Sequence, residues 1–372
     1  MNSTRVFIVA GESSGDLHAS KLMYHLKQIL PEVSFIGIGG KRMEEQGLQS
    51  IVPLERVSVV GFAEVIKNIN FFRRTLKKCK NVLENENIDI VVLVDFPGFN
   101  IRIAEIASSL KIPVCYYIAP QLWAWGKKRV NKLKKYVDLL LVVFPFEQEF
   151  FSQYLDNVEF VGHPLLDEPI FQNDILRFEE RENSIAILPG SRKSEISYHK
   201  KLVFKIIELL QREFPEFSIK IPELQSSFFG EFAKEVKTKY RQVVFELNSY
   251  NVLSSSKVGI IKSGTSNLEA ALLGLPFVMF YKTSFATYFI AKQLVELNYI
   301  SIVNVLLNSK FVPEFIQREA SPKNIVGAIK DILSNQEIYI QMQSSFSTIK
   351  QILGGSGASE RAAKKIIEHF GL

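Results

Sequence analysis

The chain is poor in cysteine: it has only Cys79 and Cys115 among 372 residues, far apart and without the spacing of metal ligands. This scarcity argues against a disulfide framework or a zinc site and favours a reducing, cytoplasmic compartment. No uninterrupted apolar run reaches the roughly 20 residues that a membrane-spanning helix needs. The apolar stretch near the N-terminus is too short for a signal peptide. We therefore expect a globular protein that works in the cytoplasm.

Familiar nucleotide-binding and catalytic signatures are also missing. The first glycine-rich turn, GESSGD at 11–16, lacks the Gly-x-Gly-x-x-Gly spacing of a nicotinamide site, and no Gly-Lys-Ser/Thr follows it as in a Walker loop. No Ser/His/Asp or Cys/His set is arranged for nucleophilic catalysis. His18 and His163 lie near turns and could act as bases, but a histidine there can equally cap or pack. The chain also lacks short-period repeats and low-complexity tracts.

What the chain does have is an ordinary globular composition, with 47% hydrophobic and 23% charged residues. Its length predicts about two domains. The formal net charge of +6 and the pI of about 9.0 are mildly basic. That balance suits phosphorylated substrates, an anionic membrane surface or nucleic acid, so it does not choose among them.

Short apolar runs alternate with helical patterns twice along the chain, which predicts an α/β protein built from two similar Rossmann-like domains facing one another. The polar, charged stretch 165–183 is the predicted linker. We expect an N-terminal domain over 1–165 and a C-terminal domain over 166–344.

Four turn motifs follow predicted strands: GESSGD, DFPGFN, PGSR and KSGT. Their joint placement describes a cleft between the two domains, with acids mainly on the N-terminal side and basic and small residues on the other. Asp95 in DFPGFN ends a near-continuous apolar run, the position where ligands meet open α/β sheets. It is our candidate general base, and the alternative is that it only caps the next helix.

The PGSR turn supplies Gly190, Ser191 and Arg192, and the guanidinium of Arg192 can clamp a diphosphate with two hydrogen bonds. Backbone N–H groups and a helix dipole would add to that clamp, so the site would need no metal. The alternative is that Arg192 pairs with Glu195 one turn further on.

The KSGT turn joins a predicted strand to a predicted helix, and helix N-termini suit anionic ligands. We expect Ser263, Gly264 and Thr265 to contact such a ligand, with Gly264 allowing close approach. Glu269, in the first turns of the helix, is expected to accept from a pair of ligand hydroxyls.

Two segments combine aromatic and basic residues. The stretch 61–80 offers Phe62, Phe71, Phe72 and Arg73 for contact with an anionic bilayer, or it is simply a helix that packs on the sheet. The second segment could bind phosphate head groups, a membrane interface or nucleic acid, or be a solvated helix. Its candidate residues are Trp123, Trp125, Lys127, Lys128 and Arg129.

Taken together, these motifs resemble the lipid-A-disaccharide synthase family, a two-domain glycosyltransferase family of the GT-B architecture. The resemblance covers essentially the whole chain, and its most specific parts are the tryptophan motif and PGSR. The matching stretches are GESSGD (11–16), GFAEV (61–65), DFPGFN (95–100), YYIAPQLWAWGKKR (116–129), FVGHPL (160–165), LPGSRKSEI (188–196), KSGTSNLEAALLGLPFVMFYKT (262–283), NVLL (304–307), VPEFIQ (312–317) and GGSGASERAA (354–363).

The resemblance implies a metal-free and cofactor-free inverting transfer from UDP-2,3-diacylglucosamine to the 6-hydroxyl of 2,3-diacylglucosamine 1-phosphate (lipid X), at the inner-membrane surface. Asp95 would be the base and Arg192 would face the UDP. Asn304, Glu314 and Gln317 would complete the donor site, and Glu12, Ser14 and Asp16 would face the acceptor. Residues from about 345 to 372 would return to the N-terminal domain.

Two rival functions stay open at this point. One is another sugar-nucleotide enzyme of the same fold, such as a lipid-linked GlcNAc transferase or a UDP-GlcNAc 2-epimerase. The other is a basic membrane-surface or nucleic-acid-binding protein without catalysis. Our prediction includes no nucleic-acid partner, and it leaves the oligomeric state open.

Overall fold

A computed structural model of the chain describes residues 4–57, 69–124, 129–224, 226–284, 288–289 and 298–372. The chain divides into two compact units. Unit 1 is Met1–Glu168 with Leu353–Leu372, and unit 2 is Pro169–Ile352. The chain therefore returns to unit 1 at Leu353, later than the predicted position of about 345.

Unit 1 contains a parallel seven-stranded sheet, sheet A, with strand order β3-β2-β1-β4-β5-β6-β7. Its strands are β1 Arg5–Ala10, β2 Ser34–Gly39, β3 Leu48–Pro53, β4 Ile90–Val94, β5 Val114–Tyr117, β6 Leu139–Val142 and β7 Val158–Phe160. Its helices are α1 Ser13–Ile29, α2 Lys41–Glu45, α3 Leu54–Val57, α5 Ile69–Asn85, α6 Pro97–Ser109, α7 Val130–Tyr136, α8 Pro145–Phe151, η2 Pro164–Asp167 and α17 Ala358–Phe370.

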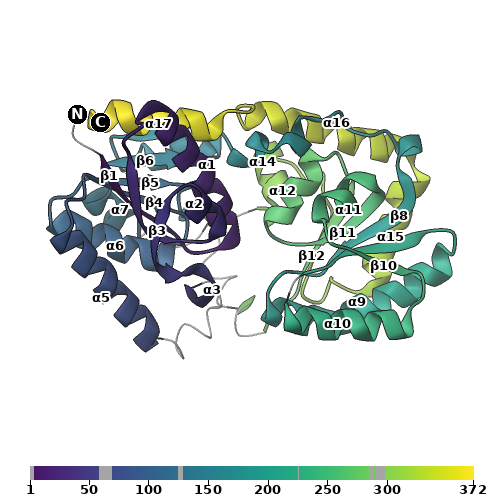
Figure 1. The fold of residues 1–372 in the computed structure, drawn as a ribbon. Coiled ribbons are helices and arrows are strands. Elements are labelled where there is room, and N and C mark those ends of the chain that lie inside the picture. Colours follow the sequence, from purple (N-terminus) through teal and green to yellow (C-terminus); the bar gives the residue numbers. More distant parts are fainter. Residues whose placement is uncertain (1–3, 58–68, 125–128, 225, 285–287, 290–297) are drawn as a thin grey trace. The chain divides into compact units, whose positions relative to one another are not determined.

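The central strands of sheet A are apolar throughout because helices cover both faces of a parallel sheet. Every residue of β4 is buried, and α1 and α17 pack side by side over one face while α5 and α6 pack together over the other (Figure 1). The last helix is fixed at its start by Asp167, whose carboxylate accepts from the backbone N–H groups of Gly357, Ala358 and Ser359 at 2.7, 3.0 and 2.9 Å. A carboxylate at a helix N-terminus stabilises it, so Asp167 holds the C-terminal helix on unit 1.

Unit 2 repeats the design with a parallel six-stranded sheet, sheet B, in the order β10-β9-β8-β11-β12-β13. Its strands are β8 Glu182–Leu188, β9 Ser218–Pro222, β10 Val243–Glu246, β11 Ser256–Lys262, β12 Phe277–Tyr281 and β13 Glu314–Ile316. Its helices are η3 Pro169–Gln172, η4 Phe178–Glu180, α9 Lys193–Glu213, α10 Ser227–Lys239, α11 Ser249–Ser255, α12 Thr265–Leu272, α14 Ile302–Leu307, α15 Pro322–Ser334 and α16 Gln336–Ile352.

Both sheets have a topological switch point. Strands that come before it in the chain are added to one side of the first strand, and later strands are added to its other side. In sheet A it lies between β1 and β4, whose last residues Ala10 and Val94 are paired. In sheet B it lies between β8 and β11, where Leu188 pairs with Ile261. Ligands of open α/β sheets bind at the carboxyl ends of the strands at such a point. All four predicted turn motifs follow these four strands.

Candidate functional site

Asp95 follows β4 at the switch point of sheet A, and its backbone is held in an unusual conformation. Its φ is +48°, and Phe96 follows with φ +49°. The Asp95 carbonyl oxygen accepts from the Tyr116 hydroxyl at 2.7 Å and from the Asn100 side-chain amide at 2.7 Å. These two bonds fix the turn, so they also fix the direction in which the half-buried Asp95 side chain leaves the backbone.

Phe96 is the more strained of the two residues, since a bulky side chain rarely adopts positive φ. Such a conformation costs of order 1–3 kcal/mol and persists only where packing enforces it. The ring of Phe96 covers Gly11, where an added Cβ would lie only 2.2 Å from the ring. The GESSGD and DFPGFN turns are therefore packed against each other, and Gly11 is required by that contact.

The Asp16 carboxylate is bound to backbone groups within unit 1. It is buried and accepts from the backbone N–H groups of Gly40, Met43 and Arg42 at 2.8, 3.2 and 3.3 Å, at the start of α2. Asp16 therefore caps a helix, and its place on the acceptor side stays a prediction. Glu12 is the half-buried N-cap residue of α1, and Ser14 is exposed in its first turn; their predicted role remains a proposal.

The two histidines that could act as bases form a buried pair in unit 1. The rings of His18 and His163 meet edge to face with centroids 6.4 Å apart. Burial lowers the pKa of His18 to about 4 and that of His163 to about 3. A base works best with a pKa near the operating pH, so this environment favours the packing alternative over catalysis.

Trp123 is tied into unit 1 through its indole. The Nε1–H donates to the carboxylate of Glu147 at 2.9 Å, and the ring lies edge-on to Phe146 at 4.8 Å. Burial raises the pKa of Glu147 to about 7, although hydrogen bonds from Trp123, Phe144 and Val143 act to lower it. The structure thus gives Trp123 a packing contact within unit 1, and its contact with a membrane stays a prediction. Trp125, Lys127 and Lys128 lie outside the described residues.

Helix α5 packs on the core of unit 1. This is the alternative that we gave for the stretch 61–80, a helix that packs on the sheet. Phe71 and Phe72 are half-buried against that core, with the Phe72 ring 6.1 Å from Phe99. Arg73 is exposed on α5, and Arg129 is exposed just before α7. Phe62 lies outside the described residues. Membrane contact through Arg73 and Arg129 stays a prediction.

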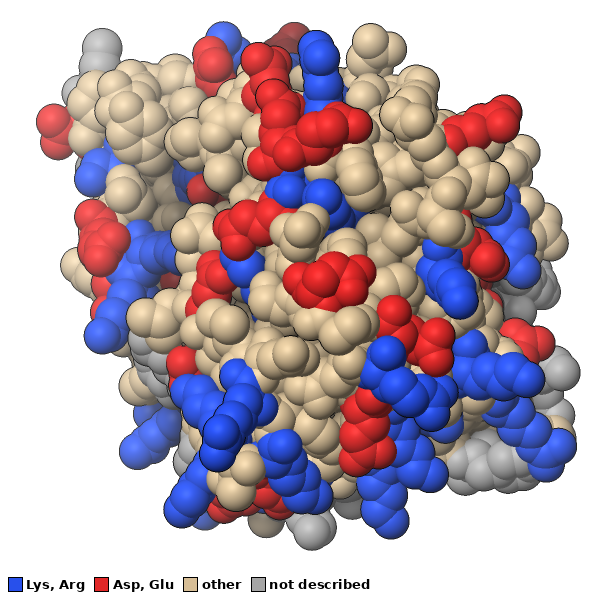
Figure 2. Space-filling view, turned by 90° about the vertical axis from the view of Figure 1, so that its right-hand side faces the viewer, with Lys and Arg blue, Asp and Glu red and all other residues tan. Residues whose placement is uncertain are grey.

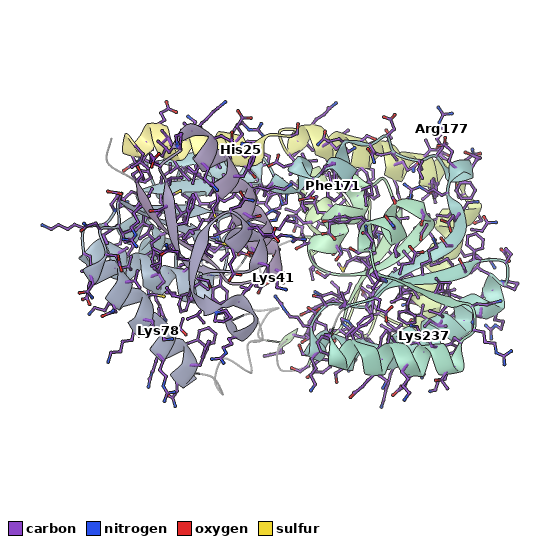
Figure 3. The ribbon with its side chains drawn as sticks, in the orientation of Figure 1. His25, Lys41, Lys78, Phe171, Arg177 and Lys237 are labelled. Carbon is purple, nitrogen blue, oxygen red and sulfur yellow. The ribbon has the colours of Figure 1, made fainter. Side chains whose placement is uncertain are left out.

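Exposed basic side chains gather on the outer surface of both units. Lys78 on α5 and Lys237 on α10 are examples that Figure 3 labels. Figure 2 shows Lys and Arg concentrated at the lower edge of the visible face. In unit 2, the exposed lysines of α9 and α10 are Lys193, Lys201, Lys205, Lys234, Lys237 and Lys239. Several face carboxylates or rings, as Lys237 does with Phe245 at 4.9 Å, so they belong to an ordinary mixed surface.

At the switch point of sheet B, Glu195 organises the PGSR turn. One carboxylate oxygen accepts from the backbone N–H groups of Ser191 and Arg192 at 3.0 and 3.3 Å, and the other pairs with Lys262 Nζ at 2.7 Å. Burial acts to raise the pKa of the Glu195 carboxyl, but Lys262, the Ser191 N–H group and the charge of Arg192 bring it below its usual value. Gly190 has φ +122°, and its alpha-carbon hydrogen faces Glu195. The Arg192–Glu195 alternative is therefore partly realised, through the Arg192 backbone.

The KSGT turn follows β11 and leads into α12. Gly264 and Thr265 are exposed and Ser263 is half-buried, while the Asn267 side chain donates to the Lys262 carbonyl at 2.9 Å and fixes the turn. Glu269 lies one turn into α12, and burial raises its pKa to about 7. The structure thus brings Gly190, Arg192, Gly264 and Glu269 to the ends of two neighbouring strands.

Three predicted donor-site residues have their polar atoms engaged elsewhere. The Glu314 carboxylate accepts from Ile300, Ser301 and the Asn304 side chain, each within 3.2 Å, and Asn304 also bonds both backbone groups of Val312. Gln317, at φ +51°, bonds the backbone of Thr283. Asn304 and Glu314 therefore shape the loop before α14, and their role as ligand contacts stays a prediction.

His199 is a site residue that sequence reasoning missed. Its ring is buried between two loops, with Nδ1 2.6 Å from the Pro189 carbonyl and Nε2 3.0 Å from the Lys282 carbonyl. Burial lowers its pKa, although both carbonyls act to raise it. The ring links the PGSR turn to the segment after β12. Its position four residues after Glu195, on the same helix face, was the available signal.

Among the described residues, no group of three or more His, Cys, Asp and Glu side chains is arranged to hold a metal ion. Within the same part of the chain, no helix has both the length and the apolar character needed to cross a bilayer.

The fold matches solved structures of sugar-nucleotide enzymes. A UDP-GlcNAc 2-epimerase from Neisseria meningitidis, solved with UDP-GlcNAc, superposes with a TM-score of 0.68 at 15% identity, covering 98% of this chain and 100% of that one. The calicheamicin glycosyltransferase CalG4 gives a TM-score of 0.63 at 15% identity, covering 100% and 99%. At such low identity these matches show the fold, which is GT-B with two Rossmann-like domains.

Sequence comparison goes further than fold. A protein from Persephonella marina named lipid-A-disaccharide synthase is 34% identical over 381 aligned positions, covering 98% of both chains. One of the same name from Nitrosococcus oceani is 36% identical, covering 96% of this chain and 94% of its own. The family model described as lipid-A-disaccharide synthetase matches residues 6–368. The chain belongs to the lipid-A-disaccharide synthase family.

Proposed function

We propose that the chain is an inverting glycosyltransferase that joins UDP-2,3-diacylglucosamine to 2,3-diacylglucosamine 1-phosphate. The products are the β-1,6-linked disaccharide 1-phosphate and UDP. Family membership over the whole chain supports the reaction, and the single structural observation that carries it is Asp95. This acid ends a central strand at the switch point of sheet A and is held there by two hydrogen bonds to its backbone.

In this reaction Asp95 accepts the proton of the acceptor 6-hydroxyl as the oxygen attacks the anomeric carbon. Inversion requires that the attack come from the side opposite the leaving UDP, so the base must be held in one direction. The left-handed turn at Asp95 and Phe96, locked by Tyr116, Asn100 and Gly11, supplies that fixed direction. Glu12 and Ser14, in the adjoining turn, are proposed to contact the acceptor.

Unit 2 is proposed to hold the UDP. As the bond to the anomeric carbon breaks, negative charge grows on the diphosphate, and the Arg192 guanidinium and the start of α12 are placed to stabilise it. Ser191, Ser263, Gly264 and Thr265 border that position, and Glu269 is proposed to hold the ribose hydroxyls. No step in this scheme calls for a metal ion.

The direct test is a transfer assay with both diacylated glucosamines, followed by NMR of the product. The proposal predicts release of UDP and a β-configured 1,6 linkage. A product with retained configuration, or UDP release without a disaccharide, would refute it. Thermal protection by UDP but not by nucleic acid would in addition exclude the non-catalytic alternative.

The epimerase alternative rests on fold alone. The epimerases found among solved structures share 12–15% identity with this chain, whereas the lipid-A-disaccharide synthases share 30–36% over nearly the whole length. An epimerase would convert UDP-GlcNAc into its C2 epimer without any acceptor, which NMR of UDP-GlcNAc incubated with the protein alone would detect. We further propose that the enzyme works at the cytoplasmic face of the inner membrane, because both substrates carry acyl chains that reside in a bilayer.

A further inference from the structure

Lys262 is a lysine at the carboxyl end of β11, and nothing in the proposed mechanism uses it. Its side chain is 17% exposed, and its ammonium pairs with the 13%-exposed carboxylate of Glu195 at 2.7 Å. Lys262 is the first residue of the KSGT turn, at the end of β11, and Glu195 lies in the first turn of α9, which follows β8. The ion pair therefore joins the two sides of the switch point of sheet B. Lys262 is therefore held between the two turns proposed to receive the UDP.

The ammonium lies close to the beginning of α12. A Cβ added at Gly264, the N-cap residue of that helix, would lie 3.3 Å from Lys262 Nζ. A positive charge beside a helix N-terminus is electrostatically unfavourable, since that end of the helix is itself positive. The Lys262–Glu195 ion pair offsets this cost, yet Arg192 and the start of α9 add further positive potential at the same place. Glu195 thus faces the Lys262 ammonium and the charge of Arg192 beside two helix starts, a combination suited to an anionic ligand.

An ammonium group has three N–H donors, so one ion pair with Glu195 does not exhaust them. Lysine is a common phosphate ligand because its flexible stem carries a compact point charge with three N–H donors. Glu195 in turn keeps the ammonium in place, since its other oxygen is bound to the Ser191 and Arg192 N–H groups.

We propose that Lys262 is a binding residue for the diphosphate of the donor, and that Glu195 positions it. This inference rests on the proposed function, since it names a further residue of the same UDP site. Arg192 and Lys262 would approach the diphosphate from the two neighbouring turns, β8–α9 and β11–α12.

The test compares UDP with uridine, which shares the base and ribose but lacks the diphosphate. Isothermal titration with the full-length chain is expected to show that Lys262→Met lowers UDP affinity at least tenfold and leaves uridine affinity unchanged. Lys262→Arg, which keeps the charge, is expected to retain most of the UDP affinity. Lys257→Met is the matched control, because Lys257 is at the other end of β11, where it bonds Asn183 at 2.6 Å.

Glu195→Gln removes the negative charge of Glu195 and keeps its hydrogen bonds to the PGSR turn. Glutamine can still accept from the Ser191 and Arg192 N–H groups but can no longer hold the Lys262 ammonium, so UDP affinity is expected to fall, by less than in Lys262→Met, which also loses the charge. The proposal is overturned if Lys262→Met binds UDP as well as the wild type, if it loses UDP and uridine equally, or if Glu195→Gln loses UDP as severely. Failure of the wild-type protein to bind UDP at all would instead refute the proposed function.

Discussion

The two switch points share one topology but are held together by different physics. In unit 1 the turns are fixed by packing and neutral hydrogen bonds: Phe96 over Gly11, and Tyr116 and Asn100 on the Asp95 carbonyl. In unit 2 charge takes part as well: the Glu195–Lys262 ion pair joins the two turns, beside the neutral bond of Asn267 to the Lys262 carbonyl. In each unit the two turns follow adjacent parallel strands. The strand geometry therefore does not explain why the turns are held differently.

The contrast follows from what each edge is proposed to do. A general base must be aimed within a narrow angle, which rigid packing and a strained backbone achieve. A diphosphate site must hold a large negative charge that is present only while the ligand is bound. An ion pair suits this need because its charged groups can turn to the ligand when it binds. Variants in unit 1 should therefore change turnover or stability and leave UDP affinity unchanged, whereas variants in unit 2 should weaken ligand binding, with or without a loss of turnover.

The largest effect is expected from Asp95→Asn. The amide cannot take the hydroxyl proton, so turnover in the transfer assay should fall by a factor on the order of 10²–10⁴, with UDP affinity kept. Asp89→Asn is the matched control, since Asp89 lies just before the other end of β4 and its carboxylate accepts from the Arg5 N–H. Near-full turnover of Asp95→Asn would show that Asp95 is not the base.

The next effect is expected from Arg192→Ala at the edge of sheet B. Loss of a charge-stabilising donor at the leaving group should lower turnover by a factor on the order of 10²–10³ and weaken UDP binding as well. The exposed neighbour Lys193→Ala should change both much less. Unaltered rate and UDP affinity in Arg192→Ala would show that the clamp is elsewhere.

Trp123→Phe tests whether unit 1 depends on its neutral bonds. Removing the indole N–H leaves the buried Glu147 short of a partner and should cost about 1–3 kcal/mol of unfolding free energy. The pKa of Glu147, about 7, exceeds its unfolded value, so this group binds a proton on folding and its contribution falls as pH rises from 4.5 to 7. The variant should raise that pKa further.

Urea unfolding of Trp123→Phe should accordingly show a larger loss at pH 8 than at pH 5. Trp123→Phe combined with Glu147→Gln should lose the pH dependence. Unchanged stability together with weakened binding to anionic vesicles would support the membrane role that the sequence predicted for Trp123.

The smallest effect concerns Glu269 in unit 2, whose pKa is raised to about 7. A carboxylate that accepts from ribose hydroxyls must be deprotonated, so binding is weakened as pH falls below that value. Uridine affinity should drop about tenfold between pH 8 and pH 6, and Glu269→Gln should flatten the profile. Uridine is used because its own groups do not titrate in this range. A flat wild-type profile would place the ribose elsewhere.

Much of the architecture follows from local sequence. Apolar runs such as 88–94, broken by glycine-containing turns, predict parallel strands because both faces of such strands are buried. The alternation of strand and helix then limits the fold to two Rossmann-like domains, and the four turn motifs fall where the strands end. Asp95, Arg192 and the KSGT turn were found in this way, since their positions depend only on which residue follows which strand.

Only the tertiary structure decided which polar groups are already occupied. Asp16 and Glu314 look like ligand contacts in the sequence, yet their carboxylates accept from backbone N–H groups of α2 and of the loop before α14. Trp123 likewise finds its partner 24 residues away. Local patterns record what a side chain can do, whereas its hydrogen-bond partner depends on chain segments that folding brings close. The ion pair of Lys262 with Glu195, joined across 67 residues, is visible only at that level.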